Sequence, residues 1–302
     1  MNILSVLKKH GFAGSLKLFP KWLEQHRQEK EQERKLREVR LTEDEVFVIK
    51  EVQGSRMLLN LNDAGISREL CLTGVHEPES TKQYVKELKS GMTIFELGAN
   101  VGYYALLGAK VIGETGKIIA FEPSPVNMEN FRLNVVLNNL EDRVESYQMG
   151  IGSSVGILKF NVVNKGNMSS FFQRKEDGVV EMCDTIDVPV TTVDAFIENN
   201  PCKIDYMRMD VEGFEVEIFK GMKNFLKSEY APEGFFIEIH CGLLNENNTS
   251  CREFVENLSS YDYEISIARW RGIPELSVNS IEELLRHELC EIGYWEAFFT
   301  KI

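Results

Sequence analysis

The stretch TIFELGANVGYYALLGAK, residues 93–110, decides the fold of this chain. It reads as an apolar strand, a loop with two glycines and an apolar helix. A dinucleotide-binding loop has the pattern G-x-G-x-x-G, in which the second glycine lets the backbone approach a pyrophosphate. Here the glycines are Gly98 and Gly102, and Asn100 stands where that second glycine would be. The loop is therefore predicted to turn tightly without cradling a pyrophosphate.

The segments that follow alternate between strand-like and helix-like patterns. Strands are expected at residues 93–97, 116–122, 143–149, 204–210, 235–240, 263–268 and 294–300. Helices are expected between the first five of them, near 103–112, 126–138, 193–199 and 213–227. Strands separated by helices indicate parallel βαβ units. We therefore predict an α/β fold, Rossmann-like, with a mostly parallel seven-stranded sheet and helices on both faces.

Two regions depart from this alternation. Between residues 150 and 192, the runs ILKFNVV and TIDVPVTTV predict an inserted β-hairpin on the cleft side of the sheet. Before the alternation begins, a second hairpin is predicted at 45–61, after a charged helical segment. We therefore divide the chain into an N-terminal helical and β-hairpin extension, residues 1–78, and a main domain, residues 79–302.

Three capping-box patterns predict helix starts. Each is a serine followed three residues later by Glu or Gln, which can satisfy the first free N–H groups of a helix. They begin at Ser80, Ser250 and Ser280. In the segment MDVEGFEVE, Glu215 and Glu217 are expected to lie on the solvated face of a helix.

The composition indicates a soluble cytoplasmic protein that does not bind nucleic acid. The 302 residues are 43% hydrophobic and carry a net charge of −13, which repels a phosphate backbone. The six cysteines form no C-x-x-C pair and are expected to be reduced. Residues 1–23 contain four lysines, no acid and apolar residues at roughly helical spacing. They predict a helix packed on the protein, with peripheral contact to an anionic membrane surface as the alternative.

Acids and a histidine end the predicted strands, where open α/β sheets bind their ligands. Glu122 ends the second strand, and an acid at that place accepts hydrogen bonds from ribose hydroxyls. Ribose occurs in both NAD and S-adenosylmethionine, so the first loop has to distinguish them. Glu96 in that loop suits the ammonium group of S-adenosylmethionine and would repel a diphosphate. We therefore predict S-adenosylmethionine as the cofactor and rank an NAD dehydrogenase last.

In this order, ELGANVGYY, FEPSP, VVLNNL, IDYMRMDVEGFEVEIFKGM and FIEIH resemble the FkbM-type methyltransferases. The resemblance covers roughly residues 64–240. It implies a class I, S-adenosylmethionine-dependent methyltransferase fold, and many members methylate hydroxyls of sugars or sugar-bearing metabolites. Arg208 departs from the family pattern, since many relatives have lysine there. The resemblance implies cofactor-binding roles for Glu96, Gly98, Asn100, Gly102, Tyr103, Glu122, Pro123, Ser124, Met149 and Gly150.

Methyl transfer to a sugar hydroxyl needs positioning and a base, because the hydroxyl is weakly acidic. The candidates are Asp210 and Glu212 at the end of the fourth strand and His240 at the end of the fifth. These three could also hold a divalent metal, but we expect none. Contacts with the acceptor are predicted for Ser169 and Ser170 and for the segment 64–78, which includes Arg68 and His76.

The leading function is therefore O-methylation of a hydroxyl on a sugar, glycolipid or glycosylated metabolite. The expected partner is a small-molecule or glycan acceptor. An RNA methyltransferase, acting for example on tRNA, is disfavoured by the net charge and by the absence of any Pro-Pro pair. A non-catalytic module that binds S-adenosylmethionine is the remaining alternative. The acidic strand ends argue against it. The sequence does not indicate an oligomeric state.

Overall fold

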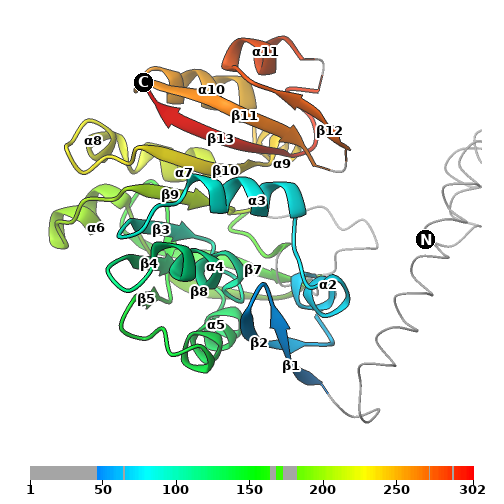
Figure 1. Ribbon diagram of the computed structural model, residues 1–302. Helices are drawn as coiled ribbons and strands as arrows, with labels where there is room; N and C mark the ends of the chain where they lie inside the picture. The colour runs from blue at the N-terminus through cyan, green and yellow to red at the C-terminus, as the bar shows by residue number, and fades with distance from the viewer. Residues whose placement is uncertain (1–45, 64, 164–167, 173–181, 272, 288) are drawn as a thin grey trace, which may run out of the picture.

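The computed structural model describes residues 46–63, 65–163, 168–172, 182–271, 273–287 and 289–302. Its centre is an eight-stranded sheet with the order β12-β11-β13-β10-β9-β3-β4-β5 (Figure 1). The predictions of a basic amphipathic helix and a charged helix within residues 1–45 lie outside the described residues. Among the helices of the described part, none combines the length and the apolar character needed to cross a membrane.

The sheet contains all seven predicted strands and one more. The strands are β3 (Thr93–Leu97), β4 (Lys117–Phe121), β5 (Val144–Tyr147), β9 (Tyr206–Met209), β10 (Gly234–Ile239), β11 (Tyr263–Trp270), β12 (Ile273–Val278) and β13 (Trp295–Lys301). The first five are parallel, and β13, β11 and β12 add to β10 by antiparallel pairing. The eighth strand, β12, has the sequence IPELSV and lies at the sheet edge, where proline is tolerated. The strand was not predicted from the sequence, because proline is not expected in the interior of a strand.

The strand order places the switch point of the sheet between β3 and β9. From β3 the chain moves outward to β4 and β5, and it then returns to β9 and β10 on the other side of β3. The crevice at such a point, beyond the carboxyl ends of the strands, is where open α/β sheets bind ligands. The residues that follow β3 and β9 therefore carry the site.

Helices cover both faces of the sheet, as predicted. On one face lie α3 (Pro78–Glu87), α4 (Tyr103–Ile112) and α5 (Pro125–Leu137). On the other lie α6 (Val193–Asn199), α7 (Glu215–Lys220), α8 (Lys223–Leu226), α10 (Cys251–Ser259) and α11 (Ile281–Arg286). Strands covered on both sides are mostly apolar, and every residue of β9 and β10 is buried, the charged Arg208 and Glu238 included.

Two predicted helices differ from those observed. The helix expected to open at Ser80 begins at Pro78, because proline suits the first helical position, and Ser80 donates a hydrogen bond to Glu296 instead. The helix expected over 213–227 is divided into α7 and α8 at Gly221. A Cβ atom at Gly221 would lie 2.0 Å from the carbonyl oxygen of Gly152, so the backbones touch there. The caps at Ser250 and Ser280 are confirmed, since each side chain accepts a hydrogen bond from the N–H three residues on.

Both predicted hairpins are present. In the inserted one, β7 (Gly156–Val163) pairs antiparallel with β8 (Met182–Thr191), and β6 (Gly150–Ile151) completes a small three-stranded sheet. In the N-terminal one, β1 (Phe47–Val52) pairs with β2 (Ser55–Asn60). Two short helices were not predicted, α2 (Ile66–Thr73) and α9 (Cys241–Glu246).

The N-terminal hairpin packs on α4 and α5. The Asn134 side chain accepts a hydrogen bond from Leu58 N–H at 2.6 Å and donates one to the carbonyl oxygen of Val101 at 2.9 Å. Met57 and Leu59 are buried in the same apolar cluster as α4. The domain division at residue 78 stays a prediction, and the residues on its two sides share one core.

Candidate active site

A pocket opens at the carboxyl ends of β3, β4 and β9. It encloses about 570 Å³, a volume that includes space open to solvent. Apolar side chains supply much of the wall, among them Phe160, Phe171 and Phe214. The wall also contains many of the residues singled out in the sequence: Gly98, Asn100, Glu122, Pro123, Met149, Gly150, Ser169, Asp210 and Glu212.

The loop after β3 is held against both neighbouring strands. The N–H groups of Gly98 and Ala99 donate to the carbonyl oxygen of Phe121, at 2.9 and 3.0 Å. Gly98 has φ +83°, and a Cβ atom there would lie 2.0 Å from the carbonyl oxygen of Asp210. Glycine is therefore required for the loop to lie between Phe121 and Asp210.

Glu122 is fixed by backbone donors. One carboxylate oxygen accepts from Asn100 N–H at 2.8 Å and the other from Ser124 N–H at 2.9 Å. The side chain is nearly buried but lines the pocket. Burial raises the pKa of Glu122 to about 7, although the N–H donors act in the opposite direction. The carboxylate is thus oriented at the place where β4 ends.

Glu96 lies behind the loop and is absent from the pocket wall. Its carboxylate accepts a hydrogen bond from Arg208 at 2.6 Å, and Arg208 also donates to Asp210 at 3.0 Å. The guanidinium carbon of Arg208 lies 3.9 Å from the centre of the Tyr104 ring. Burial raises the pKa of Glu96 to about 6, against the opposing effect of Arg208. Within the described residues, the second carboxylate oxygen of Glu96 has no hydrogen-bond partner.

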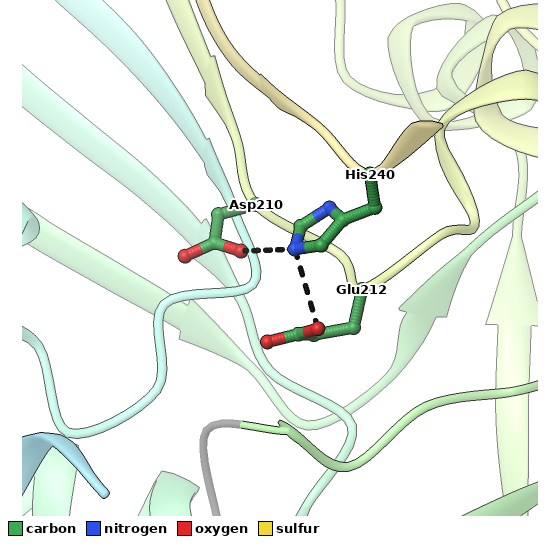
Figure 2. Close-up of side chains that lie close together, drawn as sticks. All are labelled: Asp210, Glu212 and His240. Carbon is green, nitrogen blue, oxygen red and sulfur yellow. Dashed lines mark ion pairs between the residues drawn. The ribbon is translucent and has the colours of Figure 1, made fainter. Parts of the chain in front are cut away.

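Asp210, Glu212 and His240 come together, as Figure 2 shows. His240 follows β10, and its Nε2 lies 3.2 Å from Oε2 of Glu212 and 4.0 Å from Oδ1 of Asp210. The imidazole is completely buried, whereas both carboxylates line the pocket. The cluster therefore presents its acids to the pocket and its histidine behind them.

Glu215 completes this cluster, and the prediction that it is solvated was wrong. It is fully buried, and Oε1 lies 2.6 Å from Nδ1 of His240. Burial lowers the pKa of His240, but the carboxylates of Glu212 and Glu215 outweigh it and raise that pKa well above its usual value. Residues 215, 218, 219 and 222 are all buried at helical spacing, and this stripe in the sequence could have revealed Glu215.

The small sheet supports Glu212. That residue has φ +53°, an uncommon backbone conformation for a side chain of this kind. Its carbonyl oxygen accepts a hydrogen bond from Ser170 Oγ at 2.8 Å. Ser169 lines the pocket, while Ser170 is buried beneath it. The inserted hairpin therefore both walls the pocket and holds the segment that carries Glu212.

Several residues predicted to bind ligands lie outside the pocket wall. Gly102 precedes α4, Ser124 caps α5, and Tyr103 is buried with its hydroxyl 3.1 Å from Thr81 Oγ1. His76 is buried and belongs to a second charged cluster described below. The ligand-binding roles given to these residues stay predictions.

Comparison with known proteins identifies the family. The family described as "Methyltransferase FkbM domain" matches residues 96–265, more than half of the chain. This chain belongs to that family. The protein is therefore an S-adenosylmethionine-dependent methyltransferase with a class I, Rossmann-like fold.

Other proteins to which the chain is similar are also named as methyltransferases. The methyltransferase sdnD of Sordaria araneosa is 27% identical over 206 residues, which cover 57% of this chain and 79% of that protein. The hexuronic acid methyltransferase AglP of Haloferax volcanii is 24% identical over 174 residues, covering 55% of this chain and 64% of that one. An O-methyltransferase from Bacillus cereus, solved with S-adenosylhomocysteine, has a TM-score of 0.42 at 14% identity, covering 75% and 82% of the two chains.

The pocket fits the methyl donor of this family. Glu122 offers a fixed carboxylate suited to ribose hydroxyls, and Asn100 replaces the glycine that a pyrophosphate would need. The unpartnered oxygen of Glu96 is a buried acceptor behind the same loop. These groups suit the adenosine and the amino acid part of S-adenosylmethionine better than they suit a dinucleotide.

Proposed function

We propose that this enzyme transfers the methyl group to a hydroxyl of a sugar, glycolipid or glycosylated metabolite. The observation that carries the proposal is that one pocket is lined by Glu122 on the β4 side and by Asp210 and Glu212 on the β9 side. If Glu122 binds the ribose of the methyl donor, the carboxylates of Asp210 and Glu212 on the β9 side are available to bind the acceptor. The name of the relative AglP, a hexuronic acid methyltransferase, supports a sugar as the acceptor.

When bound, S-adenosylmethionine supplies the methyl group, whose bond to sulfur breaks as the bond to the acceptor oxygen forms, with the electron pair remaining on sulfur. Glu122 would orient the donor through its ribose hydroxyls. Gly98 would allow the loop to lie flat against the methionyl part. The role of Glu96 toward the ammonium stays a prediction, because its carboxylate is buried behind the loop and bonded to Arg208. Pro123, Met149 and Gly150, which line the pocket, would enclose the adenosine.

The cluster of Asp210, Glu212 and His240 receives the hydroxyl proton. Arg208 holds one oxygen of Asp210, so that its other oxygen, 4.0 Å from His240, is turned toward the cluster. Glu215 fixes the ring of His240 by its bond to Nδ1. A positioned base of this kind typically contributes ~10²–10⁴-fold to the rate.

The test uses donor labelled with ¹³C in the methyl group and a panel of uronic acids, neutral glycosides and glycolipids, with total tRNA as a comparison. The carbon chemical shift of the product distinguishes O-methyl from N-methyl and C-methyl groups. We expect an O-methyl product with one of the sugars. Methylation of tRNA alone, or at nitrogen alone, would overturn the proposal.

A matched pair of variants tests the donor side. Glu122→Gln removes one charge from the donor site and is expected to weaken S-adenosylhomocysteine binding ~10-fold or more, because hydrogen bonds to charged groups contribute about 1.5–3 kcal/mol. Glu145→Gln, on the neighbouring strand and paired with the exposed Lys117, is the control. Equal affinities of the two variants in calorimetry would exclude Glu122 from the donor site.

We propose that the protein acts in the cytoplasm on small or glycan acceptors and not on nucleic acid. Its net charge of −13 supports this choice. Contact between residues 1–23 and a membrane surface stays a prediction.

A further inference from the structure

We propose that Asp210, Glu212 and His240 bind a divalent cation of the Mn²⁺ or Mg²⁺ kind at the acceptor end of the pocket. From the sequence we expect no metal at these residues, but the geometry of the three side chains favours one. The binding itself is independent of the acceptor, whereas the role given to the cation below rests on the proposed function.

The three candidate ligand atoms have the spacing of a coordination site. They lie within 4.8 Å of one another. Two of the separations are 3.2 Å, from Glu212 Oε2 to His240 Nε2, and 4.0 Å, from Asp210 Oδ1 to the same nitrogen. Ligands at ~2.1 Å from a six-coordinate ion are ~3 Å apart when adjacent and ~4.2 Å apart when opposite. Small side-chain movements would therefore place all three on one ion.

His240 is oriented as a metal ligand. Its Nδ1 is engaged by the buried carboxylate of Glu215 at 2.6 Å, which leaves Nε2 as the atom that faces the two acids. Within the described part of the chain, Nε2 has no partner with the geometry of a hydrogen bond, although the ring is fully buried. A carboxylate behind the imidazole is the common support of metal-bound histidine, since it fixes the tautomer and ring orientation.

The protein holds the acids in place before any ion arrives. Arg208 binds the second oxygen of Asp210, and Ser170 binds the carbonyl oxygen of Glu212. Glu212 adopts φ +53°, and uncommon backbone conformations of this kind gather at functional sites. Both carboxylates line the open pocket, so an ion would keep coordination positions for water or substrate.

The ligand set decides the kind of cation. Two carboxylates and one imidazole suit Mn²⁺, which accepts oxygen and nitrogen ligands, and Mg²⁺ to a lesser degree. In the proposed reaction the ion would bind the acceptor oxygen and lower its pKa. The hydroxyl proton then passes to the carboxylate of Glu212 as the new bond to carbon forms. No oxidation or reduction is involved.

The experiment titrates the chelator-treated full-length protein with Mn²⁺ and follows the electron paramagnetic resonance signal of the free ion. We expect one site per chain. Asp210→Asn, Glu212→Gln and His240→Gln should each lower the Mn²⁺ affinity at least 10-fold. Glu215→Gln should lower it ~10–100-fold through the histidine, as is usual for such supporting residues. The control, Glu217→Gln, removes a carboxylate two residues away that is paired with Lys220, and should leave the affinity unchanged.

Calorimetric binding of S-adenosylhomocysteine, measured in the presence of chelator, monitors the donor site and the fold of each variant. Donor binding without Mn²⁺ binding would overturn the cation site and leave the methyl-donor site intact. Mn²⁺ binding that survives Asp210→Asn and Glu212→Gln would also overturn it, since the ion would then lie elsewhere. Mn²⁺ binding in a protein that methylates no hydroxyl would sustain the site and reject the proposed function.

Discussion

Two buried histidines, His240 and His76, each lie between two carboxylates, yet they have different surroundings. Around His76 the carboxylates belong to Glu69, 2.6 Å from Nδ1, and Glu77, 3.0 Å from Nε2. His240 has nearly the same arrangement, with carboxylate distances of 2.6 and 3.2 Å. Both imidazoles therefore have the partners that stabilise a positive charge or orient a ring.

The difference lies in what else reaches the carboxylates. Beside His76, the guanidinium of Arg271 lies 2.9 Å from Glu77 and also contacts Glu238, so a built-in cation sits among the acids. Beside His240, the guanidinium of Arg208 likewise holds one oxygen of Asp210, and Glu238 lies 3.8 Å from Nε2. What differs is that Asp210 and Glu212 line the pocket. The protein therefore supplies the partners of the acids beside His76, whereas the acids beside His240 face a pocket that can hold a ligand.

The largest expected effect separates the two clusters by catalysis. Asp210→Asn keeps the shape of the side chain but removes its charge, and we expect kcat to fall ~10²–10⁴-fold. Glu69→Gln alters an acid that binds His76 outside this pocket, and kcat should stay nearly unchanged. Steady-state methyl-transfer rates measure both. A loss of the same size in the two variants would remove the distinction between the clusters.

The next effect concerns the built-in cation. Arg271→Met leaves Glu77 and Glu238 without their guanidinium, and we expect the free energy of unfolding to fall by roughly 2–4 kcal/mol. The value is set below that of a fully buried pair because the Arg271 side chain is 32% exposed. Urea denaturation measures the change. A variant as stable as the parent would show that the acids do not depend on Arg271.

A smaller effect compares the carboxylates that hold Nδ1 of each ring. Both bonds are 2.6 Å long, but the Glu215 side chain is 0% exposed and the Glu69 side chain 42% exposed. Replacing Glu215 by Met should cost about 1–3 kcal/mol, because a buried donor loses its acceptor. Glu69→Met should cost at most about 1 kcal/mol, as for an exposed ion pair. Equal unfolding free energies would mean that burial does not set the strength of these contacts.

The last effect is a pH dependence of stability on the His76 side. Burial, with help from Glu77, raises the pKa of Glu296 to about 7. The folded state then holds a proton that the unfolded state releases above its ordinary pKa of 4.5, so stability falls as pH rises from about 4.5 to 7. Glu296→Gln should reduce that slope by up to ~1.4 kcal/mol per pH unit. Glu282→Gln, on the surface and paired with Arg286, should leave the slope unaltered in urea titrations at several pH values.

The sequence predicts the parts of this molecule that depend on local pattern. The seven strands can be predicted because most are apolar runs between helical segments, and their ends place Glu122, Asp210 and His240 at one edge of the sheet. The split at Gly221 was missed because it depends on contact with Gly152 of another segment. The eighth strand was missed because its proline contradicts the pattern of a central strand.

The sequence predicts the residues that face the pocket but not the residues that hold them in place. Asp210, Glu212 and His240 follow from strand ends, but the burial of Glu215 requires knowing which face α7 turns to the core. The charged cluster of His76 is less visible still, since Arg271 comes from the far end of the chain and meets Glu77 only in three dimensions. The positions of Glu96 and Tyr103 behind the pocket wall likewise depend on tertiary packing.

The contact at Gly98 has a consequence for engineering. The loop that holds the methyl donor and the carbonyl group of Asp210 are so close that not even one methyl group fits between them. A redesign that moves the donor-binding loop will therefore disturb the segment that carries Asp210 and Glu212, and a change to that segment will disturb the loop. The inserted hairpin contributes Phe160 from β7, and Ser169 and Phe171 from the segment between β7 and β8, to the same pocket. New acceptor preferences are best sought there, where the walls can be changed and the donor half left alone.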